Sequence, residues 1–173
     1  NGYAFNEQHW QNEGKPIIRI QNLTDKTKPF NRTRHDPGRQ FCVVSGDVLV
    51  SWSATLDVFV WDGEDALLNQ HIFVVKPDYS QVDKAYLLYA LRKAVDSMAK
   101  HTHGSTMKHV NRGAFLSTSI PLPSVAEQRR IAAILDKADA IRRKRREALK
   151  LADEFLRAAF LDLFGDPVTN PKS

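Results

Sequence analysis

The chain has 173 residues, of which 42% are hydrophobic and 26% are charged, and its formal net charge is +5. These proportions are typical of a globular protein, and no apolar run approaches the roughly 20 residues that a membrane-spanning helix requires. A modest excess of positive charge permits an anionic partner such as nucleic acid without requiring one.

The first part of the chain predicts a strand followed by a basic loop. Residues 1–16 contain turn formers and no clear element, and residues 17–23 (IIRIQNL) predict a strand. Residues 24–39 are polar, include proline and glycine, and predict a flexible loop. The basic residues of this loop are Lys26, Lys28, Arg32, Arg34 and Arg39. Such a loop is either ordinary solvated surface or a contact to the phosphates and base edges of nucleic acid.

Further strands are predicted between residues 41 and 75. Residues 41–45 and 46–54 predict a pair joined by a turn at Gly46 and Asp47. In the second of these strands apolar and polar side chains alternate, as in a half-buried strand. Residues 67–75 (LLNQHIFVV) predict one continuous strand, which Pro77 ends.

Residues 82–98 predict an amphipathic helix, and residues 100–115 predict a loop. This loop lies in a stretch without acidic residues, so it is a second candidate contact to phosphates, with a solvated surface loop as the alternative. Its candidate residues are Lys100, His101, His103, Ser105, Thr106 and Lys108. The globular part is therefore predicted to be α+β, with mainly antiparallel strands.

Residues 125–165 predict one long helix of about 60 Å, at about 1.5 Å per residue. Ser124 is expected to cap its start, and Gly165 to end it. An apolar stripe this long requires a second long helix, and an antiparallel coiled coil is expected. The residues expected in the seam are Ile131, Leu135, Ala138, Leu149, Ala152, Leu156, Ala159 and Leu163. The run RRKRR at 142–146 wraps the helix and is either a solvated face or a contact to an anionic partner.

No arrangement of residues typical of catalysis, metal binding or cofactor binding is recognisable. His101 and His103 have no further ligand nearby in sequence, so a hydrogen-bonding pair is expected there rather than a metal site. Cys42 lies in an apolar context, which predicts a buried small side chain. A chain with one cysteine has no disulfide framework, which favours a cytoplasmic location.

Several segments resemble one known family. Residues 120–136 (IPLPSVAEQRRIAAILD) are similar to the segment PLPPLxEQxxIxxxL, which opens the long spacer helix of type I restriction-modification specificity subunits. NGYAF, IIRIQNL, GDVLVSWSAT, LNQHIF and GSTMKHVNRGAF resemble successive landmarks of the target recognition domain in that family. In this order the set is specific, although each landmark alone is weak.

The resemblance implies a recognition subunit without catalytic chemistry of its own. Such a subunit reads double-stranded DNA and holds methyltransferase and restriction subunits in place. Residues 1–123 would form the recognition domain, 124–165 the dimerisation helix, and 166–173 a tail or the start of a linker. One domain with one helix is expected of a half-length subunit or of a fragment of a longer one.

The leading hypothesis is therefore a non-catalytic DNA-recognition subunit that pairs through its long helix. The two basic loops are expected to contact DNA, and Ser51, Trp52 and Ser53 are expected to line the same face. The alternative is a protein-binding adaptor that uses only its helix. A stand-alone nuclease or methyltransferase is disfavoured because the motifs of those enzymes are missing.

Overall fold

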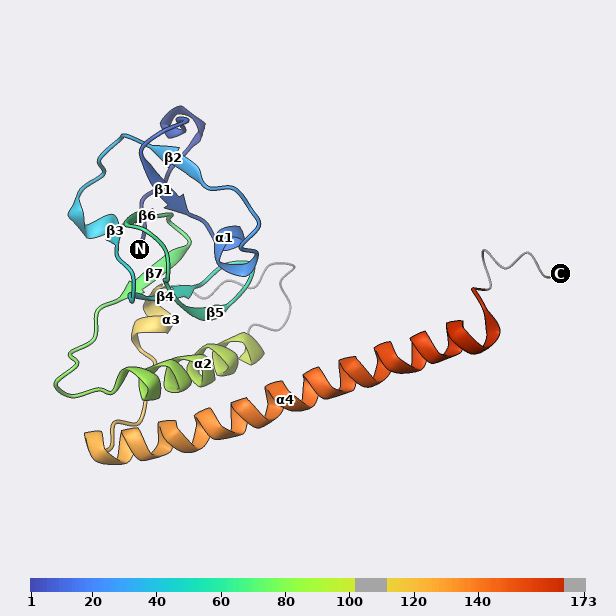
Figure 1. Ribbon diagram of the computed structural model, residues 1–173. Helices are drawn as coiled ribbons and strands as arrows, with labels where there is room; N and C mark the ends of the chain where they lie inside the picture. The colour runs from blue at the N-terminus through green and yellow to red at the C-terminus, as the bar shows by residue number, and fades with distance from the viewer. Residues whose placement is uncertain (102–111, 167–173) are drawn as a thin grey trace. The chain divides into compact units, whose positions relative to one another are not determined.

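The computed structural model describes residues 1–101 and 112–166 (Figure 1). The chain divides into two units, residues 1–129 and 130–173. Among the described residues, the first unit holds two small β-sheets and short helices, and the second consists mainly of one long helix. In this part of the chain no helix has the length and apolar character needed to cross a membrane. The arrangement confirms the predicted α+β class with a long C-terminal helix.

The first unit contains a four-stranded sheet and a three-stranded sheet. Their strands are β1 (Lys15–Ile18), β2 (Asn31–Thr33), β3 (Cys42–Val43), β4 (Val48–Ser51), β5 (Asp57–Val60), β6 (Ala66–Leu68) and β7 (Ile72–Val75). In the larger sheet, β1 pairs antiparallel with β2 and parallel with β6, which pairs antiparallel with β3. In the smaller sheet, β4 lies between β5 and β7 and is antiparallel to both.

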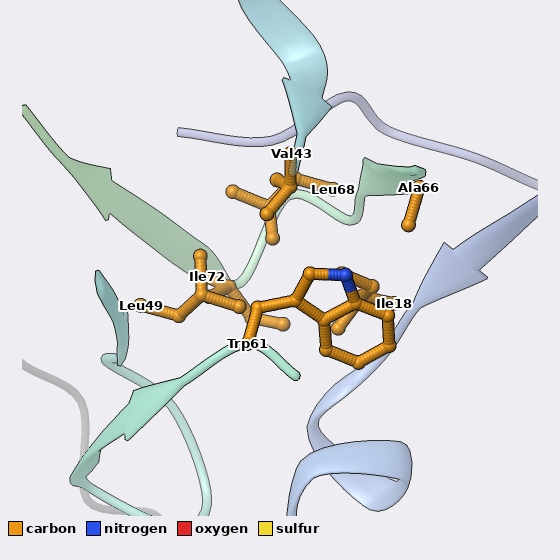
Figure 2. Close-up of a cluster of buried hydrophobic side chains, with 7 residues drawn as sticks. All are labelled: Ile18, Val43, Leu49, Trp61, Ala66, Leu68 and Ile72. Atoms are coloured by element: carbon orange, nitrogen blue, oxygen red, sulfur yellow. The ribbon is translucent and has the colours of Figure 1, made fainter. Parts of the chain in front are cut away.

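Apolar side chains from both sheets meet in one buried cluster (Figure 2). Ile18 and Leu68 come from the larger sheet, and Leu49 and Ile72 come from the smaller one. Trp61, directly after β5, packs into the same cluster, and its indole N–H donates a hydrogen bond to a backbone carbonyl at 2.8 Å. Burial of such side chains is worth roughly 1.5–3 kcal/mol each, so the cluster holds the two sheets together.

The strand predicted at residues 17–23 is wrong beyond Ile18. The chain forms a short helix, α1 (Ile20–Thr24), because the buried side chain of Asn22 forms hydrogen bonds with backbone groups on both sides of it in sequence. Its carbonyl oxygen accepts a hydrogen bond from the amide of Arg19 at 3.1 Å, and its amide donates to the carbonyls of Lys28 and Pro29. These bonds compete with strand pairing and close the following turn.

The single strand predicted at residues 67–75 is also wrong, because the run forms β6 and β7 in different sheets. Between them the amide of Ile72 donates to the carbonyl of Asn69 at 3.2 Å, which turns the chain. The N-terminal segment, predicted to have no element, pairs here through Gly2 and Tyr3 and then forms the 3-10 helix η1 (Glu7–His9). A Cβ atom on Gly2 would meet a backbone oxygen at 2.2 Å, so only glycine fits.

Short elements interrupt the segments predicted as loops. Within 24–39 the chain forms β2, and Arg39 begins the 3-10 helix η2 (Arg39–Phe41). The predicted helix at 82–98 is confirmed as α2 (Lys84–His101), which places Lys100 and His101 in helix rather than loop. After residues 102–111, which are not described, α3 (Arg112–Leu116) follows where a loop was expected.

The long helix is α4 (Val125–Phe164), in agreement with the sequence prediction. The Ser124 hydroxyl accepts a hydrogen bond from the Glu127 amide at 3.3 Å, as expected of an N-cap. Gly165 follows the last turn with φ +73°, a conformation that glycine adopts without strain. The amide of Gly165 donates to the carbonyl of Leu161 at 2.9 Å and so closes the helix.

The first turn of α4 belongs to the first unit, and Gln128 joins it to α2. This side chain is 0% exposed. Its carbonyl oxygen accepts a hydrogen bond from the Asp83 amide at 2.8 Å, and its amide donates to the carbonyls of Gln81 and Pro123 at 3.0 and 2.8 Å. Nearby, the hydroxyl of Tyr86 donates to the carbonyl of Pro121 at 2.7 Å.

We predict that Gln128→Met destabilises the chain by about 2–4 kcal/mol, because it keeps the volume but leaves buried backbone groups without partners. Denaturant unfolding followed by circular dichroism measures the change. Arg129→Gln is the matched control: its exposed ion pair with Asp83, at 3.8 Å, contributes about 1 kcal/mol or less. Equal stability of both variants would contradict this role for Gln128.

Candidate functional site

The basic residue Lys26 is paired with an acidic residue. Its ammonium group donates a hydrogen bond to the carboxylate of Asp62. This hydrogen bond and the positive charge lower the pKa of the Asp62 carboxyl below its usual value. The pair neutralises its own charge, so Lys26 contributes less to the positive field of the surface than the sequence indicates.

Two arginines of the same segment are also held by carboxylates. Arg32 donates to Glu64 at 2.7 Å and to the carbonyl of Gly14 at 2.9 Å, and Arg34 donates to Glu13. Together with the Lys26 pair, these contacts join the segment to residues that precede it and follow it in the sequence. The segment predicted as a flexible loop is therefore fixed by long-range contacts.

Lys28 and Arg39 differ from the other three basic residues of this segment. Both side chains are exposed, and neither forms an ion pair with the residues that the structure describes. An unpaired exposed cation is free to neutralise a phosphate without first breaking a contact. Of the five predicted residues here, these two are the best placed for an anionic partner.

Ser51 is turned into the structure, with an exposed fraction of 1%. Its hydroxyl donates to the carbonyl of Thr55 and accepts from the amide of Asp57 at 3.1 Å, so it bridges the turn between β4 and β5. Ser53 is buried as well. Burial leaves both hydroxyl groups poorly placed for a ligand, and their predicted role in DNA contact is untested.

The turn between β4 and β5 also contains Ala54 at φ +59°, a region that residues other than glycine seldom adopt. Trp52 lies beside this turn and is half-buried. Its ring centroid is 5.1 Å from that of His71 and 5.9 Å from that of Phe73, and Phe73 stacks on Phe115 of α3 at 4.9 Å. This aromatic row connects β4, β7 and α3.

A polar pocket of about 290 Å³ was not predicted from the sequence. At its edge the guanidinium of Arg19 lies 5.8 Å from the ring centroid of Trp10, a cation–π arrangement. Gln21 and Gln70 also line the pocket. Arginine and glutamine are side chain types that read base edges. Arg19 falls within the strand predicted at residues 17–23, and no local pattern there indicates a binding residue.

The second predicted loop lies mostly outside the described residues. His103, Ser105, Thr106 and Lys108 fall in 102–111, whereas Lys100 and His101 belong to the last turn of α2. Within the described ranges, no group of three or more histidine, cysteine or acidic side chains is arranged to hold a metal ion. Cys42 is a free thiol, half-buried rather than fully buried as expected.

The helix α4 carries the predicted seam residues on one side. At about 100° per residue, Ile131, Leu135, Ala138, Leu149, Ala152, Leu156, Ala159 and Leu163 fall within an arc of about 120°. We call this arc the apolar face. On this face Leu149, Leu156 and Leu163 are 58%, 65% and 74% exposed. Large exposed apolar side chains in such a row are typical of an interaction surface.

Comparison with known proteins gives one consistent result. Residues 1–151 match the family model for the type I restriction modification DNA specificity domain. The chain is 30% identical over 139 residues to the type I restriction enzyme EcoBI specificity subunit of Escherichia coli, covering 79% of this chain and 29% of that protein. It is 27% identical over 101 residues to the MjaVIII specificity subunit of Methanocaldococcus jannaschii, covering 58% of this chain and 24% of that protein.

Solved structures share the fold. A chain from a study of complex assembly and conformational transition in the type I restriction-modification system has a TM-score of 0.68 at 24% identity, with 93% of this chain and 41% of that chain covered. The HsdS subunit from Thermoanaerobacter tengcongensis has a TM-score of 0.63 at 21% identity, with 87% and 36% covered. The present chain therefore spans less than a third of the curated relatives and about two fifths of the solved chains.

We predict that Ser51→Ala lowers the free energy of unfolding by about 1–2 kcal/mol, because the Asp57 amide and Thr55 carbonyl lose their shared partner. Chemical denaturation measures the loss. Ser45→Ala, at an exposed position just before β4, is the control and should change stability by less than about 0.5 kcal/mol. A Ser51 variant as stable as the wild type would show that the hydroxyl does not support the turn.

Proposed function

The chain belongs to the type I restriction-modification DNA specificity domain family, and on this premise we propose that it recognises one half of a two-part DNA site. The observation that carries the proposal is the match of the family model to residues 1–151, which include both sheets and the start of α4. In this proposal the chain itself performs no catalysis and needs no cofactor. It supplies sequence recognition to methyltransferase and restriction subunits, which would dock on it.

Contacts to DNA would divide by side chain type. Lys28 and Arg39 would neutralise phosphates, because they are exposed and form no ion pair among the described residues. Arg19, Gln21 and Gln70 would offer hydrogen bonds to base edges from the polar pocket. The residues of the second loop, Lys100, His101, His103, Ser105, Thr106 and Lys108, remain candidates from the sequence.

Two copies would pair through α4. The apolar face extends over most of the helix and exposes leucines along the part after residue 148, and burial of such a row favours association. An antiparallel pair would present two recognition domains, and identical copies would recognise a palindromic two-part sequence. Several exposed apolar residues on α4 would equally suit an adaptor that binds only proteins, so DNA binding itself is the deciding test.

We predict that the chain binds duplex DNA with strong salt dependence. For a duplex of about 40 base pairs, each lost phosphate contact reduces the slope of log K against log salt by about 0.9. For the double variant Lys28→Gln with Arg39→Gln, the magnitude of this slope in fluorescence anisotropy titrations should therefore fall by nearly two. The matched control removes two ion-paired cations, Lys26→Gln with Lys76→Gln, and should change the slope little. Salt-insensitive binding, or none, would favour the adaptor.

We predict that Leu156→Asp breaks self-association, because pairing would bury a charge without a partner. Sedimentation equilibrium should show dimerisation weakened at least about 100-fold, equivalent to roughly 3 kcal/mol. Ala158→Asp adds the same charge on the opposite side of the helix, about 180° from the apolar face, and should leave the association unchanged. If both variants remain dimers, the seam lies elsewhere.

A further inference from the structure

The middle of α4 carries a run of five consecutive cations, Arg142–Arg146, which we call the basic segment. All five residues are exposed. Arg142 forms a long ion pair with Asp139 at 3.4 Å, whereas the other four form no ion pair with any described residue. Residues 137–150 contain seven basic and two acidic side chains, so the positive charge of the chain is concentrated here.

The side chains of the basic segment are distributed around the helix axis rather than along one face. At about 100° per residue, Arg142 and Arg145 fall on the apolar face, and Arg143 and Lys144 fall on the far side. A partner helix that covers the apolar face would therefore leave Arg143 and Lys144 in solvent. Their charge is not needed for such packing, so it is available to a second, anionic partner.

The distance of the basic segment from the start of α4 can be compared with the length of a bound duplex. Arg142–Arg146 follow Val125 by 17–21 residues, which corresponds to about 26–32 Å of helix at about 1.5 Å per residue. This distance equals roughly eight or nine base pairs of duplex at about 3.4 Å each. A duplex of about 40 base pairs is therefore several times longer than this stretch of helix and offers phosphates well beyond one half-site.

We propose that the basic segment binds the phosphate backbone of the duplex beside the half-site, independently of base sequence. The inference rests on the proposed DNA-recognition function and adds a second binding site to it. Phosphate contacts require positive charge but no particular base, so the exposed and unpaired Arg143 and Lys144 on the far side of the helix are suitable for them. An acidic partner helix would instead select a stripe of cations flanking the apolar face, which five consecutive residues do not form.

The test compares two charge-neutralising variants of the same chain on one random-sequence duplex of about 40 base pairs. Arg143→Gln with Lys144→Gln should weaken binding about tenfold or more at about 100 mM salt, and lower the salt slope by nearly two. The control, Lys150→Gln with Arg157→Gln, removes the same charge from α4 outside the basic segment and should lower the slope by much less. Arg143→Lys with Lys144→Arg keeps both charges and should keep the wild-type slope.

The outcomes separate the two proposals. If the wild type shows no salt-dependent binding, the DNA-recognition function fails. If the wild type binds with a steep slope that Arg143→Gln with Lys144→Gln leaves unchanged, only the role of the basic segment fails. Loss of a co-purifying protein subunit with an unchanged slope would assign the segment to an acidic protein surface and overturn the inference. Circular dichroism of each variant confirms that α4 remains helical.

Discussion

The hydrogen bonds of Gln128 are the constraint on which this combination of a domain and a long helix depends. A single buried amide side chain in the first turn of α4 accepts from the Asp83 amide just before α2 and donates to the carbonyls of Gln81 and Pro123. A buried polar side chain is tolerated only when its groups are paired, and here all three bonds are between 2.8 and 3.0 Å. The first turn of α4 is therefore held in the first unit by a fully paired, buried side chain.

The two units differ in how their basic side chains are paired. In the first unit, carboxylates hold Lys26, Arg32 and Arg34, so these cations mainly determine where a segment lies. In the second unit, four of the five cations of the basic segment form no ion pair with a described residue, and the five span about one and a half turns of helix. Paired charges favour a defined recognition surface, whereas unpaired charges favour contact with any phosphate. This separation supports the two proposals, recognition of one sequence by the first unit and contact with neighbouring DNA by the basic segment.

Periodic segments were predictable from the sequence, and segments fixed by single side chains were not. The 3.6-residue period and the Ser124 and Gly165 signals located α4 almost to the residue, and α2 was found in the same way. The short strands were less predictable because Asn22 redirects the chain by side-chain bonds to distant carbonyls. Ion pairs such as that of Arg32 with Glu64 join residues far apart in sequence. No local sequence pattern therefore indicates which cations form ion pairs. The pocket beside Arg19 arises only from the fold.

The matched charges of residues 24–39 have a consequence for exchanging recognition segments between related proteins. The acidic partners Glu13, Asp62 and Glu64 lie outside this segment in sequence but pair with its cations. A graft that moved the segment alone would leave three carboxylates behind and bring three unmatched cations to the recipient. Chimeras that transfer the acidic residues together with the loop are therefore the ones in which the transplanted conformation should survive.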